Sequence, residues 1–184
     1  MKGFATRAVF QAFQIPEPSA RILLSDADMM PTNADYFHKP APEDGILSVF
    51  RTDSYNEWGQ VPMSYVGASQ TVWKHVFPES MDILTTWWAE QKNSYRTPWD
   101  RIGKGWFFDQ DMLTQRVLRF PHVRWWTDAE LGFKRMCRSD ARTLQNIPEF
   151  IRGGGTDYHM VREGPHMYEL AEAVLACIEP HVSK

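Results

Sequence analysis

Asp26 and Asp28 are two residues apart; they follow the apolar run Ile22–Leu24 and Ser25, shortly before Pro31. An apolar run that ends in such a break predicts a buried strand. Side chains alternate along an extended chain, so both carboxylates are expected on the same side of the strand end. Two carboxylates so placed can share one divalent cation, and the cation can neutralise phosphate charge. A solvated turn with two acids is the simpler alternative for any isolated Asp-x-Asp.

Two further groups of residues can do chemistry. Asp109 and Asp111 follow three aromatic residues at an expected helix start, where they either cap the helix or supply a general base. His159 follows three consecutive glycines, which predict a flexible turn, and we expect it on a mobile loop. An imidazole there can complete an oxygen-rich metal site or contact a phosphate, and a solvated surface histidine is the alternative.

The composition indicates a soluble globular protein. The chain has 184 residues, of which 43% are hydrophobic and 23% charged, and we expect one domain over residues 1–184. The net charge of −3 gives no general attraction to nucleic acid or anionic lipid. Neither a secretory signal nor an apolar run of about 20 residues is present, which predicts a cytoplasmic protein without a membrane span.

Helices and short strands are intermixed along the chain, which predicts an α/β fold. We expect strands at 22–25, 46–50, 61–67, 122–126 and 131–136. We expect helices at 4–13, 70–77, 80–92, from the 106–111 segment to 119, and at 167–179. Ser69 is the expected cap of the second helix. The last helix is expected to carry one apolar face, formed by Met167, Leu170, Ala171, Val174, Leu175 and Ile178.

The order of these parts resembles the metal-dependent, nucleotide-sugar glycosyltransferases of the GT-A fold, and most closely the small glycosyltransferases of large algal viruses. Residues 22–31 are similar to the apolar strand and DxD motif of that family. Residues 64–69, together with Trp73, resemble the segment that lines the donor-sugar pocket. Residues 106–113 resemble the aromatic and acidic stretch that opens a helix beside the reaction centre. The sequence Tyr158-His159-Met160 lies where many such enzymes place a metal-binding histidine.

This resemblance implies a mixed central sheet flanked by helices and a hexosyl- or deoxyhexosyltransferase, either inverting or retaining. Asp26, Asp28 and His159 would bind Mn²⁺ or Mg²⁺, with Asp26 also placed to touch the ribose of the donor. Arg162 would pair with a donor phosphate. The donor would be a UDP- or GDP-sugar, and the acceptor a glycan hydroxyl.

The resemblance also implies roles for Trp73 and for the carboxylates near residue 110. Trp73 would line the donor site, where an indole face can stack on a sugar ring. Asp109 or Asp111 would take the proton from the acceptor in an inverting enzyme, or lie near the donor sugar in a retaining one.

The chain departs from the family pattern before the DxD strand. Family members usually have several nucleotide-binding strands there, whereas a single predicted helix precedes residue 22 in this chain. The upstream half is then absent, reduced, or supplied by another chain. An exposed sheet edge is expected as a consequence, which would favour a partner chain or a second copy of this one.

Two other classes of protein compete with the transferase interpretation. A phosphatase of the haloacid-dehalogenase type also has Asp-x-Asp after an apolar strand. Met30 stands where that family has Thr or Val, however, and no convincing lysine motif follows. The other alternative is a non-catalytic carbohydrate-binding or assembly protein derived from half of a transferase.

Overall fold

The structure is a computed structural model that describes residues 17–25, 29–39, 44–54, 60–78, 108–136, 146–159 and 172–176. The chain divides into two compact units. The first comprises Met1–Asp26 with Pro42–Thr127, and the second comprises Ala27–Ala41 with Asp128–Lys184. Each unit has its own sheet and its own hydrophobic core.

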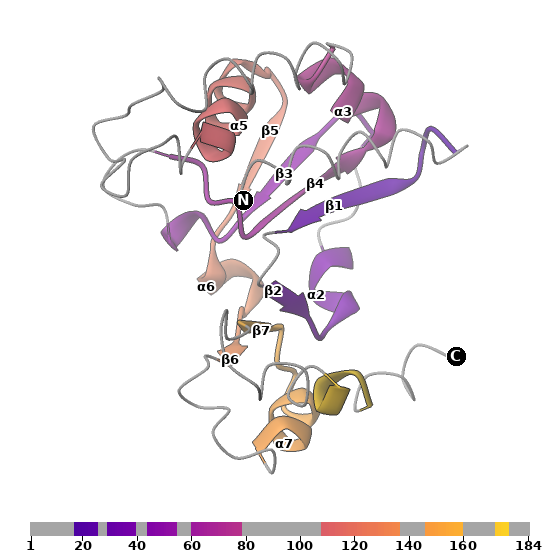
Figure 1. Cartoon of the computed structure of the whole chain (residues 1–184). Helices are drawn as coiled ribbons and strands as arrows, with labels where there is room; N and C mark the ends of the chain where they lie inside the picture. Colours follow the sequence, from indigo (N-terminus) through magenta and orange to yellow (C-terminus); the bar gives the residue numbers. More distant parts are fainter. Residues whose placement is uncertain are drawn as a thin grey trace. The chain divides into compact units, whose positions relative to one another are not determined.

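The first unit contains a four-stranded mixed sheet, called sheet A below, with the strand order β1-β4-β3-β5 (Figure 1). Strand β4 is antiparallel to both β1 and β3, and β3 is parallel to β5. The α/β class and the mixed sheet flanked by helices are therefore confirmed. The strands are β1 (Arg21–Ser25), β3 (Leu47–Phe50), β4 (Tyr65–Ser69) and β5 (Val123–Trp126).

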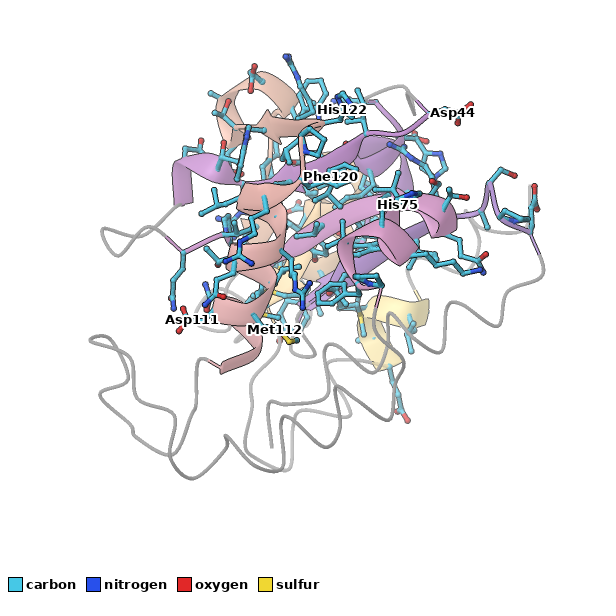
Figure 2. The ribbon with its side chains drawn as sticks, turned by 90° about the horizontal axis from the view of Figure 1, so that it is seen from above. Asp44, His75, Asp111, Met112, Phe120 and His122 are labelled. Atoms are coloured by element: carbon cyan, nitrogen blue, oxygen red, sulfur yellow. The ribbon has the colours of Figure 1, made fainter. Side chains whose placement is uncertain are left out.

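Two helices, α3 (Gln70–Val76) and α5 (Phe108–Arg119), cover one face of sheet A (Figures 1 and 2). The paired residues on that face are apolar, so the helices and strands bury a common core. Ser69 caps α3 as predicted, because its side chain accepts a hydrogen bond from the backbone N–H of Val72. The core residues are Leu24, Leu47, Val49, Val61, Met63, Val66, Ala68, Val72, Trp73, Val76, Phe77, Met112, Leu113 and Val117.

The second unit contains a smaller sheet, called sheet B below, with the order β2-β7-β6. Its strands are β2 (Met29–Pro31), β7 (Asp157–His159) and β6 (Arg135–Met136). Strand β2 is antiparallel to β7, and β6 is parallel to it. Its helices, labelled in Figure 1, are α2 (Ala34–His38), α6 (Asp128–Leu131) and α7 (Asn146–Arg152).

The two faces of sheet B differ because side chains alternate along each strand. Met30, Tyr158 and Met136 are paired across the sheet and belong to the core of this unit, with Ile147 and Val174. The opposite face carries the other paired residues: Met29 opposite His159, and Asp157 between Pro31 and Arg135. Sheet B therefore has one apolar face and one face rich in polar groups.

Two predicted strands differ from the observed ones. The strand expected at 131–136 is wrong in its first half, because Leu131 ends helix α6 and Gly132, with φ +73°, terminates that helix. The strand expected at 61–67 begins later, at Tyr65. The backbone groups of Val61 instead bond to the side chains of Gln110 and Thr114 on α5, so they are not available to a neighbouring strand.

Two other expectations concern the second unit. His159 lies in strand β7, so the prediction of a mobile loop is wrong. In the last predicted helix, residues 172–176 are helical, and Val174 is buried as expected. Leu175, however, is 47% exposed and does not belong to the apolar face. The helices expected at 4–13 and 80–92 lie outside the described residues, and no helix that is described has the length and apolarity of a membrane span.

Candidate functional site

His159 is the predicted metal ligand whose position the structure describes. It lies at the end of β7 with its side chain half-buried, directly opposite Met29 in the β2–β7 ladder. Met29 immediately follows Asp28 in the sequence. The fold therefore pairs His159 with Met29, the residue next to the DxD motif, although the two lie 130 positions apart in the sequence (159 − 29).

Asp26, Asp28 and Arg162 lie outside the described residues, so the structure does not test their predicted roles. Strand β1 ends at Ser25 and strand β2 begins at Met29, on either side of the motif. Within the described part of the chain, no three His, Cys, Asp or Glu side chains are grouped to hold a metal ion. An Asp, Asp and His donor set would suit Mn²⁺, since it combines hard oxygen ligands with one imidazole.

The segment before His159 is fixed by hydrogen bonds. The backbone N–H of Thr32 donates to the carbonyl of Thr156 at 2.9 Å, and the Thr32 hydroxyl donates to the carbonyl of Gly155, also at 2.9 Å. The ammonium group of Lys134 donates to the carbonyl of Gly153 at 2.8 Å. These bonds attach the triple-glycine turn to the residue after β2 and to the residue before β6, which positions the start of β7.

An ion pair lies on the same face of sheet B as His159. Asp157, which is 0% exposed, accepts two hydrogen bonds from the guanidinium of Arg135, the neighbouring residue on β6. The Nε–Oδ1 distance is 2.8 Å, and Nη2 bonds to Oδ2. Burial of the carboxylate is compensated by this charged partner, as a buried acid requires. This pair could not be predicted from the sequence, because a lone Arg and a lone Asp have no distinguishing spacing.

Asp111, one of the two predicted catalytic carboxylates, is the fourth residue of α5 in the first unit and is labelled in Figure 2. It is 9% exposed, and Gln60 Nε2 donates a hydrogen bond to its Oδ1 atom. The helix is fixed to the same segment by Thr114, whose hydroxyl accepts from the Val61 N–H at 2.9 Å. Gln60 is a contact that sequence reasoning missed. Asp109 belongs to α5 as well, but its side chain lies outside the described part.

Trp73, the predicted donor contact, is a core residue of the first unit. Its side chain is 0% exposed and stacks on Phe77 at a ring-centroid distance of 6.2 Å. Its indole N–H donates to the carbonyl of Ile22 at 3.1 Å, which joins α3 to β1. In this arrangement no indole face is open to a sugar ring.

Tyr158 lies between Asp157 and His159 and points to the apolar face of sheet B. Its hydroxyl is buried and makes no hydrogen bond within the described part of the chain. Burial raises the pKa of the Tyr158 phenol above its ordinary value. This side chain anchors β7 in the core, while its two neighbours face the opposite side.

Comparison with known proteins finds a solved structure that is similar to this chain. No family model matches the chain, and no curated protein matches it in sequence. The structure is similar to the crystal structure of a glycosyltransferase involved in the glycosylation of the major capsid of PBCV-1, with 12% sequence identity and a TM-score of 0.43. The alignment covers 96% of this chain and 76% of that chain.

Proposed function

We propose that this chain is a metal-dependent glycosyltransferase that moves a sugar from a nucleotide-sugar donor to a hydroxyl group of a glycan. The observation that supports it most directly is the pairing of His159 with Met29, the residue that follows Asp28. The resemblance in sequence requires the histidine to meet the DxD motif, although the two are far apart along the chain. The β2–β7 ladder pairs His159 with Met29, one residue after the motif, and this pairing supports the proposal.

Asp26, Asp28 and His159 would hold the cation, and Mn²⁺ is favoured over Mg²⁺ because one donor is an imidazole nitrogen. A bound cation would supply charge neutralisation for the diphosphate that leaves when the sugar is transferred. Arg162, three residues after His159, would pair with a phosphate oxygen. A UDP- or GDP-sugar is the proposed donor.

The proposed catalytic carboxylate is Asp109 or Asp111. Gln60 already donates to one carboxylate oxygen of Asp111, which favours a fixed orientation for that side chain. An oriented, ionised carboxylate can accept a proton from an acceptor hydroxyl. Trp73 has no part in the proposed site, since its side chain lies in the core.

Calorimetric titration with UDP and GDP, each with and without Mn²⁺, tests this proposal. We expect saturable binding of one nucleotide that requires the metal. Nucleotide binding with the same affinity in the presence and absence of Mn²⁺ would contradict the proposal. Failure of all four nucleotides, UDP, GDP, TDP and CDP, to bind would also contradict it. Metal-dependent phosphatase activity without sugar transfer would instead favour the haloacid-dehalogenase alternative.

Two variants locate the metal site. Asp28→Asn should abolish metal-dependent nucleotide binding while the fold is retained, because a carboxylate needed by the cation has been removed. His159→Ala should weaken Mn²⁺ binding about 10- to 100-fold, the scale observed when a metal shell is perturbed. His75→Ala is the matched control, since His75 is an exposed histidine on α3 in the first unit. Equal Mn²⁺ affinity in His159→Ala and His75→Ala would remove His159 from the proposed site.

A further inference from the structure

We propose that Arg135 is a positioning residue for His159 and that it acts through Asp157 and Met29. The inference rests on the proposed function for its metal-binding consequence. Its structural part, that Arg135 fixes β7 in register with β2, can be tested without any metal.

The guanidinium of Arg135 contacts β7, which contains His159, and β2, which directly follows Asp28 in the sequence. On β7 it donates two hydrogen bonds to Asp157, one from Nε at 2.8 Å and one from Nη2. On β2 the same Nη2 lies 3.1 Å from the sulfur of Met29. The guanidinium carbon is also 5.3 Å from the ring centroid of Phe133, and the side chain is only 15% exposed. One planar cation thus links β6, β7 and β2 on one face of the sheet.

These contacts lie immediately beside His159. Asp157 and His159 are two residues apart on β7, so their side chains share a face of the sheet. Met29, the other contact of Arg135, is paired with His159 across the ladder. Arg135 therefore contacts Asp157, the previous residue on the same face of β7 as His159. It also contacts Met29, the residue paired with His159 on β2.

Sheet B needs such a link because its strands are short. Strands β2 and β7 have three residues each, and β6 has two, so the backbone ladder alone contains few hydrogen bonds. A slip of one residue would turn His159 to the apolar face of the sheet. The Arg135–Asp157 pair opposes that slip because Asp157 would then leave its buried charged partner.

Arginine is the suitable residue for this role. Its planar fork can donate to both oxygens of one carboxylate and still reach a third atom, whereas lysine presents a single ammonium group. Arg135→Lys therefore keeps the positive charge beside Asp157 but loses the simultaneous contact with Met29. Arg124→Lys is the matched control, because Arg124 lies on β5 in the first unit with its guanidinium 4.4 Å from the ring centroid of Trp126.

The first experiment is amide hydrogen exchange on the metal-free protein. Arg135→Lys should speed exchange in β2 and β7 by at least about tenfold and leave β3 and β4 unchanged, since local opening can be confined to one part of a protein. Arg124→Lys should leave β2 and β7 unchanged. Parent-like exchange in β2 and β7 of Arg135→Lys would overturn the inference. If that variant does not fold, Asp157→Asn, which keeps the side-chain size, is measured with the same expectation.

The second experiment measures Mn²⁺ binding by calorimetry and by the nitrogen coupling of bound Mn²⁺ in electron paramagnetic resonance. Arg135→Lys should bind Mn²⁺ about tenfold more weakly, and the nitrogen coupling from His159 should decrease at saturating metal. Faster exchange with unchanged affinity and coupling would show a role in stability alone and would overturn the positioning role. If the parent protein itself binds no Mn²⁺, the proposed function fails, and the exchange measurement still decides whether Arg135 fixes the register.

Discussion

Sheets A and B are stabilised in different ways. Sheet A has four strands of four or five residues and packs against two helices, and every residue of β3 is buried. Sheet B has strands of two or three residues, and one of its faces is occupied by an ion pair and a histidine. The free energy gained from hydrophobic burial scales with the apolar area removed from water, so sheet A is stabilised mainly by the packing and burial of its apolar side chains. Sheet B depends on individual polar contacts, whose geometry must be exact to compensate for burial.

The difference bears on function. A densely packed sheet tolerates few changes in volume, but it does not require any particular polar residue. A small sheet whose polar face is specified by a few contacts can hold a ligand-binding side chain in one orientation. The proposed metal ligand His159 lies on the second kind of sheet, and Asp28, one of its predicted partners, directly precedes β2 in the sequence.

The largest loss of stability is expected from Trp73→Ala in the first unit. Trp73 on α3 is completely buried and bonds to β1, so its truncation leaves a cavity and removes the hydrogen bond to Ile22. We expect a loss of about 3–5 kcal/mol in the free energy of unfolding, measured by denaturant titration. Leu118→Ala on α5 is the control, since Leu118 is 60% exposed, and it should change stability by no more than about 0.5 kcal/mol. A loss below about 1 kcal/mol in Trp73→Ala would contradict the conclusion that sheet A is stabilised by the close packing of its core.

The next effect concerns the turn that leads into β7. A Cβ atom added at Gly155 would lie 2.3 Å from the ring of Phe150, so Gly155→Ala forces that ring or the turn to move. We expect a loss of about 1–3 kcal/mol, as for other overpacked sites, observed as faster amide exchange in β7. In a Phe150→Leu background the same change should cost less, because the obstructing ring is absent. Equal cost in both backgrounds would show that the ring is not the obstacle.

Gly155 also shows why part of the site could not be predicted. Three consecutive glycines predict a flexible turn, because glycine permits many backbone conformations. In the structure, Gly154 uses that freedom at φ +74°, whereas Gly155 is required for the close approach of Phe150. Sequence alone does not distinguish a glycine selected for its conformation from one selected for the space beside it.

The elements predicted correctly are those with a strong local pattern. Helix α3 follows from the Ser69 cap and its apolar spacing, and β3 follows from a short apolar run. The contacts that define the candidate site are not local. Gln60 and Asp111 are 51 residues apart, and Arg135 and Asp157 are 22 apart, so neither pair produces a periodic signal in the sequence.

The two units each contain one described helix cap of the same kind, which allows a direct comparison. Ser69 caps α3 in the first unit, and Asn33 caps α2 in the second by accepting from the Tyr36 N–H at 3.4 Å. Ser69→Ala and Asn33→Ala should each cost about 1 kcal/mol. Amide exchange should show the loss in α3 for the first variant and in α2 for the second. If either variant changed protection only in the other unit, its cap would not act on its own helix.

The smallest expected effect is from Tyr158→Phe, and it has the opposite sign. The Tyr158 hydroxyl is buried in the core of the second unit and has no hydrogen-bond partner among the residues that the structure describes, so its removal relieves a desolvation cost. We expect the variant to be as stable as the parent or up to about 1 kcal/mol more stable near neutral pH. Burial raises the pKa of this phenol in the folded state, so the folded protein holds the proton more tightly than the unfolded chain. The stability of the parent should therefore fall as the pH rises above about 10, and Tyr158→Phe should lose less over that range. Denaturant unfolding of both proteins at neutral and alkaline pH measures the difference, and a destabilised Tyr158→Phe would mean that the hydroxyl contributes a contact to sheet B after all.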